Sequence, residues 1–277
     1  MTRTAADNLS YAYDKAKEFL IKQIPSKTPE LVLEHYLSLP DKSHSPVSLE
    51  ELYQRLLESA QNANMKAGVI GKAIGGVDKL GVVLFGFNPQ KVLDFYGVDA
   101  ERVLSDIEAK LSPSGQVRKE SRSIWPKYCE TILSAARFFE QFSSGDEFYA
   151  WANHFYQDKR SIAALPMLLS EEIYGIGYAL ACDFLKELGF IKYGKPDVHV
   201  IEIFAGLGLC HEKASPYEIQ KIIIQISEAK NVSAYNVDKL FWLIGSGEFE
   251  AHPEIGKKGK IGRQKKRFIE HMRNLRS

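Results

Sequence analysis

Two glycines and one aspartate are the residues of this sequence whose types and spacing point most directly to chemistry. Gly175-Ile176-Gly177 is typical of a tight turn between two helices, because glycine allows a positive φ and a close approach of the backbone to a bulky group. Such a turn directs backbone N–H groups outward from a helix N-terminus and suits a phosphate. Asp197 lies twenty residues after Gly177, and its carboxylate is a candidate functional group. The alternative is that Asp197 only caps a helix, since aspartate is a favoured N-cap.

The elements that must position these residues are predicted to be helices. Apolar residues at helical spacing follow the turn, Gly189 is expected as a C-terminal cap, and a second apolar segment begins directly after Asp197. The segment 68–97 is rich in glycine and apolar residues, and periodicity alone leaves a strand open there. Almost nothing else alternates with period two, so we predict an all-α fold. The other helices are expected within 1–40 and at 49–60, 90–111, 129–142, 145–156, 160–171, 216–229 and 234–244.

Composition excludes several classes of protein. The 277 residues are 45% hydrophobic and 26% charged, which is ordinary for a globular protein. The longest apolar runs are too short to span a bilayer, and the N-terminus lacks the apolar core of a secretory signal. The cysteines Cys129, Cys182 and Cys210 lie far apart and have no zinc or iron–sulfur spacing. We therefore expect a cytoplasmic protein with no metal, no cofactor and no membrane partner.

Positive charge is concentrated at the end of the chain. From Lys257 onward there are nine Lys or Arg residues against the single acid Glu270, a charge of +8 in a chain whose net charge is +1. Such a block suits a polyanion. The alternative is a solvated C-terminal helix or tail.

The stretch 165–204 resembles the helix-hairpin-helix DNA glycosylase superfamily, which contains endonuclease III, the adenine glycosylase MutY and the 8-oxoguanine glycosylases. In that family a GxG hairpin is followed about twenty residues later by an aspartate, commonly within D-x-H, and here the sequence is Asp197-Val198-His199. Family members also end an early helix with polar residues whose Gln or Asn fills the gap left by a flipped base. The segment 59–64 (SAQNAN) resembles that element, with Gln61 in the wedge position. The resemblance covers roughly residues 48 to 210.

This resemblance implies a DNA glycosylase that hydrolyses the N-glycosidic bond of a flipped-out damaged, mismatched or modified base in double-stranded DNA. It implies Asp197 as the catalytic carboxylate and the hairpin glycines as DNA contacts. The predicted DNA-binding residues are Gly175, Gly177, Tyr178, Gln61, Lys195, Lys265 and Lys266, and the predicted pocket aromatics are Trp125 and Tyr128. A role in repair and a role in defence against phage DNA would use the same residues.

The sequence departs from the family pattern in two places. Bifunctional members carry a lysine two residues after the second hairpin glycine, where this chain has Ala179, and cluster-containing members carry four closely spaced cysteines that are absent here. The first departure favours a monofunctional enzyme that leaves an abasic site. The alternatives are a bifunctional glycosylase/lyase with a relocated lysine and a non-catalytic helix-hairpin-helix DNA-binding protein. Lys186, expected on a helix surface, and Lys195 are the candidate substitute amines.

The resemblance also implies a two-domain architecture with a cleft for DNA. Residues 47–178 would form a six-helix domain. Residues 1–46 and 179–277 would form the second helical domain, with the hairpin at the junction. We expect a monomer associated with the nucleoid.

Overall fold

The computed structural model describes residues 5–38, 48–62 and 68–275, and its regular elements in these ranges are helices. The all-α prediction is confirmed for the residues described. Isolated bridges at Glu248, Gly256 and Lys260 are the β-type pairings found in these ranges. No helix in the described residues has the length and apolar character needed to cross a membrane.

The chain divides into two units. Unit 1 contains residues 1–43 and 185–277, and unit 2 contains residues 44–184. The sequence prediction put these boundaries at 46/47 and 178/179, and the first of these lies outside the described residues. Unit 1 is thus built from both ends of the chain, whereas unit 2 is one continuous segment.

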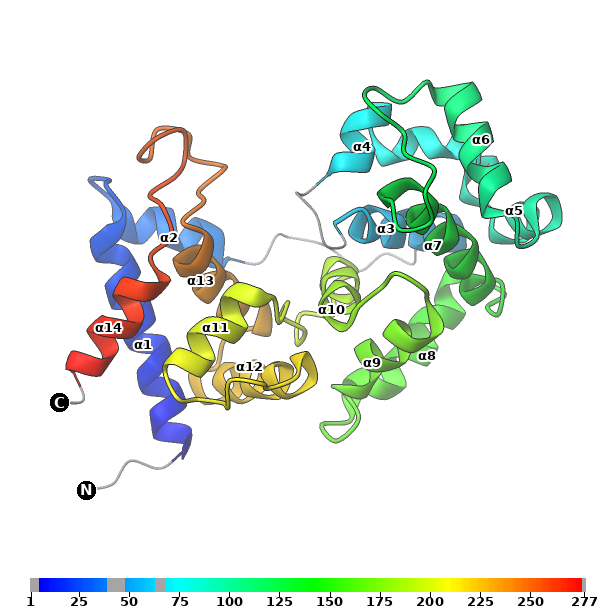
Figure 1. Cartoon of the computed structure of the whole chain (residues 1–277). Helices are drawn as coiled ribbons and strands as arrows, with labels where there is room; N and C mark the ends of the chain where they lie inside the picture. The colour runs from blue at the N-terminus through cyan, green and yellow to red at the C-terminus, as the bar shows by residue number, and fades with distance from the viewer. Residues whose placement is uncertain (1–4, 39–47, 63–67, 276–277) are drawn as a thin grey trace. The chain divides into compact units, whose positions relative to one another are not determined.

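Unit 1 is organised around α13 (Ala234–Ser246), which packs against every other helix of the unit (Figure 1). Its core contains aromatic rings in contact, with centroids 5.0 Å apart for Phe204 and Phe241 and 6.4 Å apart for Phe241 and Phe268. The surrounding helices are α1 (Ala5–Gln23), α2 (Pro29–Leu37), α11 (Val198–Gly206), α12 (Pro216–Lys230) and α14 (Lys265–Asn274).

Unit 2 is organised around α7 (Ile124–Phe139), which packs against α3, α5 and α6. Nearly every residue from 128 to 136 of this helix is buried, so α7 forms the centre of the unit. The other elements are α3 (Leu49–Ala60), α4 (Val69–Ile74), the 3-10 turns η1 (Val77–Val82) and η2 (Phe85–Phe87), α5 (Pro89–Tyr96), α6 (Ala100–Leu111), α8 (Gly145–Gln157), α9 (Ala164–Glu172) and α10 (Tyr178–Glu187), which runs across the boundary at 184/185.

The predicted elements differ from the observed ones at several places. The segment 90–111 forms two helices, because Gly97 turns the chain with a φ of 59° between α5 and α6. The possible strand near residue 85 is instead the short turn η2, because the positive φ angles of residues 85–87 exclude extended backbone there. Helix α7 begins five residues before the predicted start, because Pro126 lies in its first turn, where proline is tolerated.

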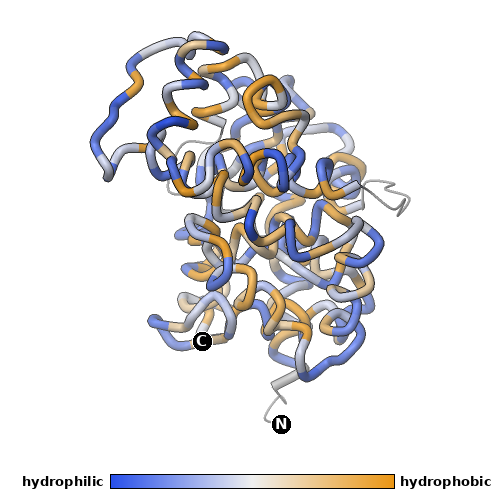
Figure 2. Tube along the Cα trace, turned by 90° about the vertical axis from the view of Figure 1, so that its right-hand side faces the viewer, coloured by the Kyte–Doolittle hydropathy of each residue, from blue (hydrophilic) through white to orange (hydrophobic). Residues whose placement is uncertain are grey.

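Local sequence signals account well for several helix boundaries. Ser48 and Glu51 form a capping box at the start of α3, with the Ser48 backbone N–H donating to Glu51 Oε2 at 2.9 Å. Figure 2 shows hydrophobic and hydrophilic residues alternating within single helices, as expected for helices that bury one face. The residues just before this capping box, 39–47, lie outside the described residues.

Candidate functional site

The hairpin between α9 and α10 depends on its first glycine. Gly175 has a φ of 81°, and a Cβ atom at this position would overlap Thr131 Oγ1 on α7. Ile176 is buried beneath the turn. Gly177 differs, because a Cβ atom there would meet no described atom within 4 Å. The fold therefore requires glycine at position 175. At Gly177 the space beside the backbone is unoccupied by described atoms, so a ligand can approach the backbone there.

Helix α7 holds this hairpin by side-chain contacts. The backbone N–H of Tyr174 donates to Ser134 Oγ at 2.9 Å, and Thr131 fills the space beside Gly175. The hydroxyl of Tyr178, a predicted DNA contact, donates to the backbone oxygen of Ala163 at 2.8 Å. Sequence reasoning missed Thr131 and Ser134, because they lie some forty residues before the hairpin and follow no local motif.

Asp197 is the N-cap of α11, as the structural alternative predicted. Its Oδ1 accepts hydrogen bonds from the backbone N–H groups of His199 at 2.9 Å and Val200 at 3.1 Å. Its own N–H donates to the backbone oxygen of Lys195 at 2.8 Å. Within the described residues Oδ2 accepts no hydrogen bond. One carboxylate oxygen is thus fixed by the helix, and the other remains available to a ligand or water.

His199 packs beside Asp197 in a constrained site. A Cβ atom at Gly245 of α13 would overlap the His199 side chain, so only glycine fits there. The Nδ1 atom is buried and has no hydrogen-bond partner among the described residues. Burial lowers the pKa of His199, the Asp197 carboxylate opposes this, and the charges of Lys265 and Arg263 add to the lowering.

The lowered pKa of His199 predicts a pH-dependent stability. Between the folded pKa and the unfolded value of about 6.5, the unfolded chain binds the additional proton, so stability falls as pH drops through this window. We expect urea unfolding from pH 7.5 to 5 to show a smaller loss of stability for His199→Asn than for wild type. A difference between the two proteins that stays constant with pH would contradict this assignment.

The two candidate lysines lie in unit 1. Lys186 pairs with Asp238 of α13 at 3.3 Å, and the two side chains are only 12% and 6% exposed. The expectation of a surface position for Lys186 is therefore wrong, because α13 supplies a buried partner that the local sequence does not reveal. Lys195 is half-buried and precedes the N-cap by two residues.

The two predicted C-terminal lysines have different environments. Lys265 forms an ion pair with Glu202 on α11 and is 21% exposed. Lys266 is exposed on the first turn of α14. The structure thus brings Asp197, His199 and Lys265 together around α11.

Gln61, the predicted wedge, is engaged within unit 2. Its Oε1 accepts a hydrogen bond from the N–H of Gly71 at 3.0 Å, and Asn62 Oδ1 accepts one from the N–H of Gly68 at 3.0 Å. Gly68 is the N-cap of α4 and has no side chain to cap it, so Gln61 performs this function from the end of α3. Ala63 and Asn64, the rest of the predicted polar element, lie outside the described residues.

Trp125 and Tyr128, the aromatic residues predicted for a substrate pocket, lie in the core of unit 2. They are 6% and 4% exposed, and the Tyr128 hydroxyl donates to the backbone oxygen of Leu57 at 3.0 Å. Burial raises the pKa of Tyr128 well above its usual range, so this phenol is a neutral hydrogen-bond donor.

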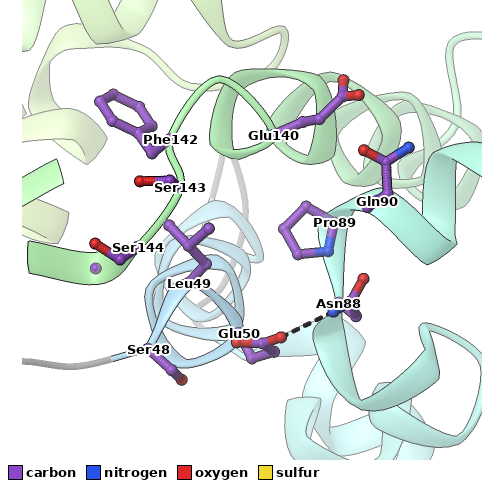
Figure 3. Close-up of a pocket in the computed structure, with 11 residues that line it drawn as sticks. Ser48, Leu49, Glu50, Asn88, Pro89, Gln90, Glu140, Phe142, Ser143 and Ser144 are labelled. Carbon is purple, nitrogen blue, oxygen red and sulfur yellow. Dashed lines mark hydrogen bonds between the residues drawn. The ribbon is translucent and has the colours of Figure 1, made fainter. Parts of the chain in front are cut away.

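Two surface pockets lined by described residues of unit 2 have volumes of about 420 and 410 Å³, and neither is lined by a predicted site residue. The first lies where α3, α5 and α8 begin, and Figure 3 shows the hydrogen bond between Asn88 and Glu50 in its wall. Three helix N-termini favour an anion, but the carboxylates of Glu50 and Glu140 oppose one. Among the described residues, no group of three His, Cys, Asp or Glu side chains is arranged to hold a metal ion.

Comparisons with known proteins give two similar solved structures. No protein-family model matches the chain, and no curated protein matches it in sequence. The 8-oxoguanine glycosylase/lyase of Methanocaldococcus jannaschii, crystallised with a 15mer DNA containing 8-oxoguanine, is 21% identical with a TM-score of 0.46, over 82% of this chain and 96% of that one. A structure of the 8-oxoguanine DNA glycosylase from the same organism is 18% identical with a TM-score of 0.48, over 87% and 97%.

Proposed function

We propose that the chain is a DNA glycosylase that removes a damaged, mismatched or modified base from double-stranded DNA and leaves an abasic site. The observation that carries the proposal is the geometry of Asp197, whose Oδ1 is fixed by two backbone N–H groups while Oδ2 is available. A carboxylate held in this way needs little reorganisation when positive charge develops beside it, which is the requirement for cleaving an N-glycosidic bond. The hairpin supports the proposal through the open side of Gly177.

The reaction is a hydrolysis at C1′ of the deoxyribose. The C1′–N bond breaks with its electron pair leaving on the base, and positive charge spreads over C1′ and the ring oxygen. Asp197 stabilises that charge, and Oδ2 orients a water molecule whose oxygen bonds to C1′. One proton of the water passes to the carboxylate or to solvent, and the departing base gains one. The products are a free base and an abasic sugar.

Water is the proposed nucleophile because the position of the lyase lysine holds no amine in this chain. Ala179 stands where bifunctional enzymes carry the lysine, and Lys186 is paired with Asp238. An amine in an ion pair is protonated and is a poor nucleophile. We therefore propose a monofunctional enzyme in which Gly175, Gly177 and Gln61 contact the DNA.

The test is a panel of duplexes, each with one altered base, incubated with purified protein and resolved before and after alkali. The panel includes 8-oxoguanine, the base acted on by the two similar proteins, together with mismatched, alkylated and bulky modified bases. The proposal predicts strand breaks that appear only after alkali. Breaks without alkali and a borohydride-trapped covalent adduct would indicate a lyase with a relocated lysine. Duplex binding with no abasic product would indicate a non-catalytic DNA-binding protein.

A further inference from the structure

The C-terminal basic segment folds against the helix that Asp197 begins. Lys265, the first residue of α14, forms an ion pair with Glu202, which follows Asp197 by five residues on α11. His199, two residues after Asp197, lies within electrostatic reach of both Lys265 and Arg263. This part of the chain therefore lies beside the first two turns of α11, next to the proposed catalytic carboxylate.

Gln264 anchors this segment in the core of unit 1. Its side chain is 7% exposed, and its backbone N–H donates to the oxygen of Ile244 on α13 at 2.9 Å. Its amide Nε2 donates to the oxygens of Ile261 and Gly262 at 2.9 and 3.0 Å. Residues on either side of Gln264 are consequently held in place, and residues 265–274 form the C-terminal helix α14.

The charges of this segment are incompletely compensated. All three residues of the first turn of α14, 265–267, are basic, although the N-terminus of a helix is the positive end of its dipole. Lys265 is neutralised by Glu202. Lys266 and Arg263 are exposed, and within the described residues neither has a carboxylate partner. Cations gathered without counter-ions at a helix N-terminus favour an anionic ligand.

We propose that Arg263 and Lys266 bind backbone phosphates of the duplex beside the nucleotide whose base is removed, and that Lys265 fixes the segment to α11 through Glu202. The inference rests on the proposed function, because it places Asp197 at the sugar of that nucleotide. Phosphate is the fitting partner, since Arg presents a planar fork of donors and Lys a point charge. Neighbouring basic residues thus have different roles. Arg263 and Lys266 bind phosphate, whereas Lys265 holds the segment against α11.

The test is the salt dependence of binding to an undamaged duplex, which requires no excision. Each phosphate contact contributes about 0.9 to the slope of log K against log salt concentration, so Arg263→Gln with Lys266→Gln should reduce the slope by about 2. Lys265→Gln should leave the slope within about 0.3 of wild type, because its charge is already paired. Lys213→Gln removes the same charge beyond the other end of α11 and serves as the matched control. Arg263→Lys with Lys266→Arg should retain the wild-type slope.

The outcomes separate this inference from the proposed function. An unchanged slope in Arg263→Gln/Lys266→Gln overturns the inference, and excision of a base by the wild type would then leave the proposed function intact. A loss of about 0.9 in Lys265→Gln or Lys213→Gln, the same loss per charge as in the double variant, also overturns it, because the effect would then follow net charge alone. A reduced slope in the double variant, with no excision of any base by the wild type, would support the phosphate contacts and contradict the proposed glycosylase activity. If the wild-type protein binds no duplex, both the phosphate contacts and the proposed function are wrong.

Discussion

Asp197→Asn should lower the rate of base excision by about 10³-fold or more while the free energy of unfolding changes little. Asparagine is as good an N-cap as aspartate, so its side-chain oxygen can still accept from the N–H groups of His199 and Val200. What asparagine lacks is the negative charge that stabilises the developing cation at C1′. The measurement is the single-turnover rate on the best duplex of the panel, together with urea unfolding of both proteins.

Asp197→Ala is the companion variant, because it removes the charge and the cap together. It should lose excision to the same extent and in addition destabilise the protein by about 1 kcal/mol, the usual cost of deleting an N-cap. The pattern to look for is equal loss of activity with unequal loss of stability. If Asp197→Asn excises the base at the wild-type rate, Asp197 is only a cap and the proposed mechanism is wrong.

Gly177→Ala should weaken duplex binding by about tenfold or more while the protein stays folded. The added methyl group meets no described atom within 4 Å, so the fold accommodates it at a cost of at most about 1 kcal/mol. The same methyl group would stand between the hairpin backbone and a phosphate, where close approach is needed. Binding to an undamaged duplex at fixed salt, with thermal unfolding in parallel, measures both effects.

Gly175→Ala is the matched variant with the opposite profile. A φ of 81° disfavours alanine, and the Cβ atom would overlap Thr131 Oγ1, so we expect about 2–4 kcal/mol of destabilisation. Adding Thr131→Ala should restore the stability lost through steric overlap. The stability lost because alanine disfavours a positive φ should remain lost. Normal DNA affinity in Gly177→Ala would show that the outward side of the hairpin does not face the backbone of DNA.

Features that short sequence patterns encode were predictable. The capping box of Ser48 and Glu51 and the tight turn at Gly175 both follow from residue types a few positions apart. The position of Asp197 before an apolar segment likewise predicted the N-cap that the structure contains. Each of these features is local, so the sequence in its immediate neighbourhood determines it.

Features that depend on distant partners could not be predicted in this way. The local sequence predicts a helix-surface position for Lys186, because its partner Asp238 lies fifty-two residues later in the chain. Gln61 caps α4 only because the chain returns to place Gly71 beside it. The pairing of Lys265 with Glu202 joins two helices that lie far apart in the sequence. Tertiary packing decides which of these polar groups remain available to a ligand.

The composition of unit 1 from both ends of the chain has a consequence for biosynthesis. Helices α1 and α2 are synthesised before unit 2, whereas their partners α12 and α13 are synthesised after it. Unit 2, a continuous segment, can fold while the chain is still growing, since domains fold as units during synthesis. The apolar faces of α1 and α2 must wait, uncovered, until the C-terminal helices emerge. The helix that Asp197 caps therefore acquires its supporting core only after α12 and α13 have been synthesised, and a nascent chain released before them would contain the folded hairpin without a packed α11.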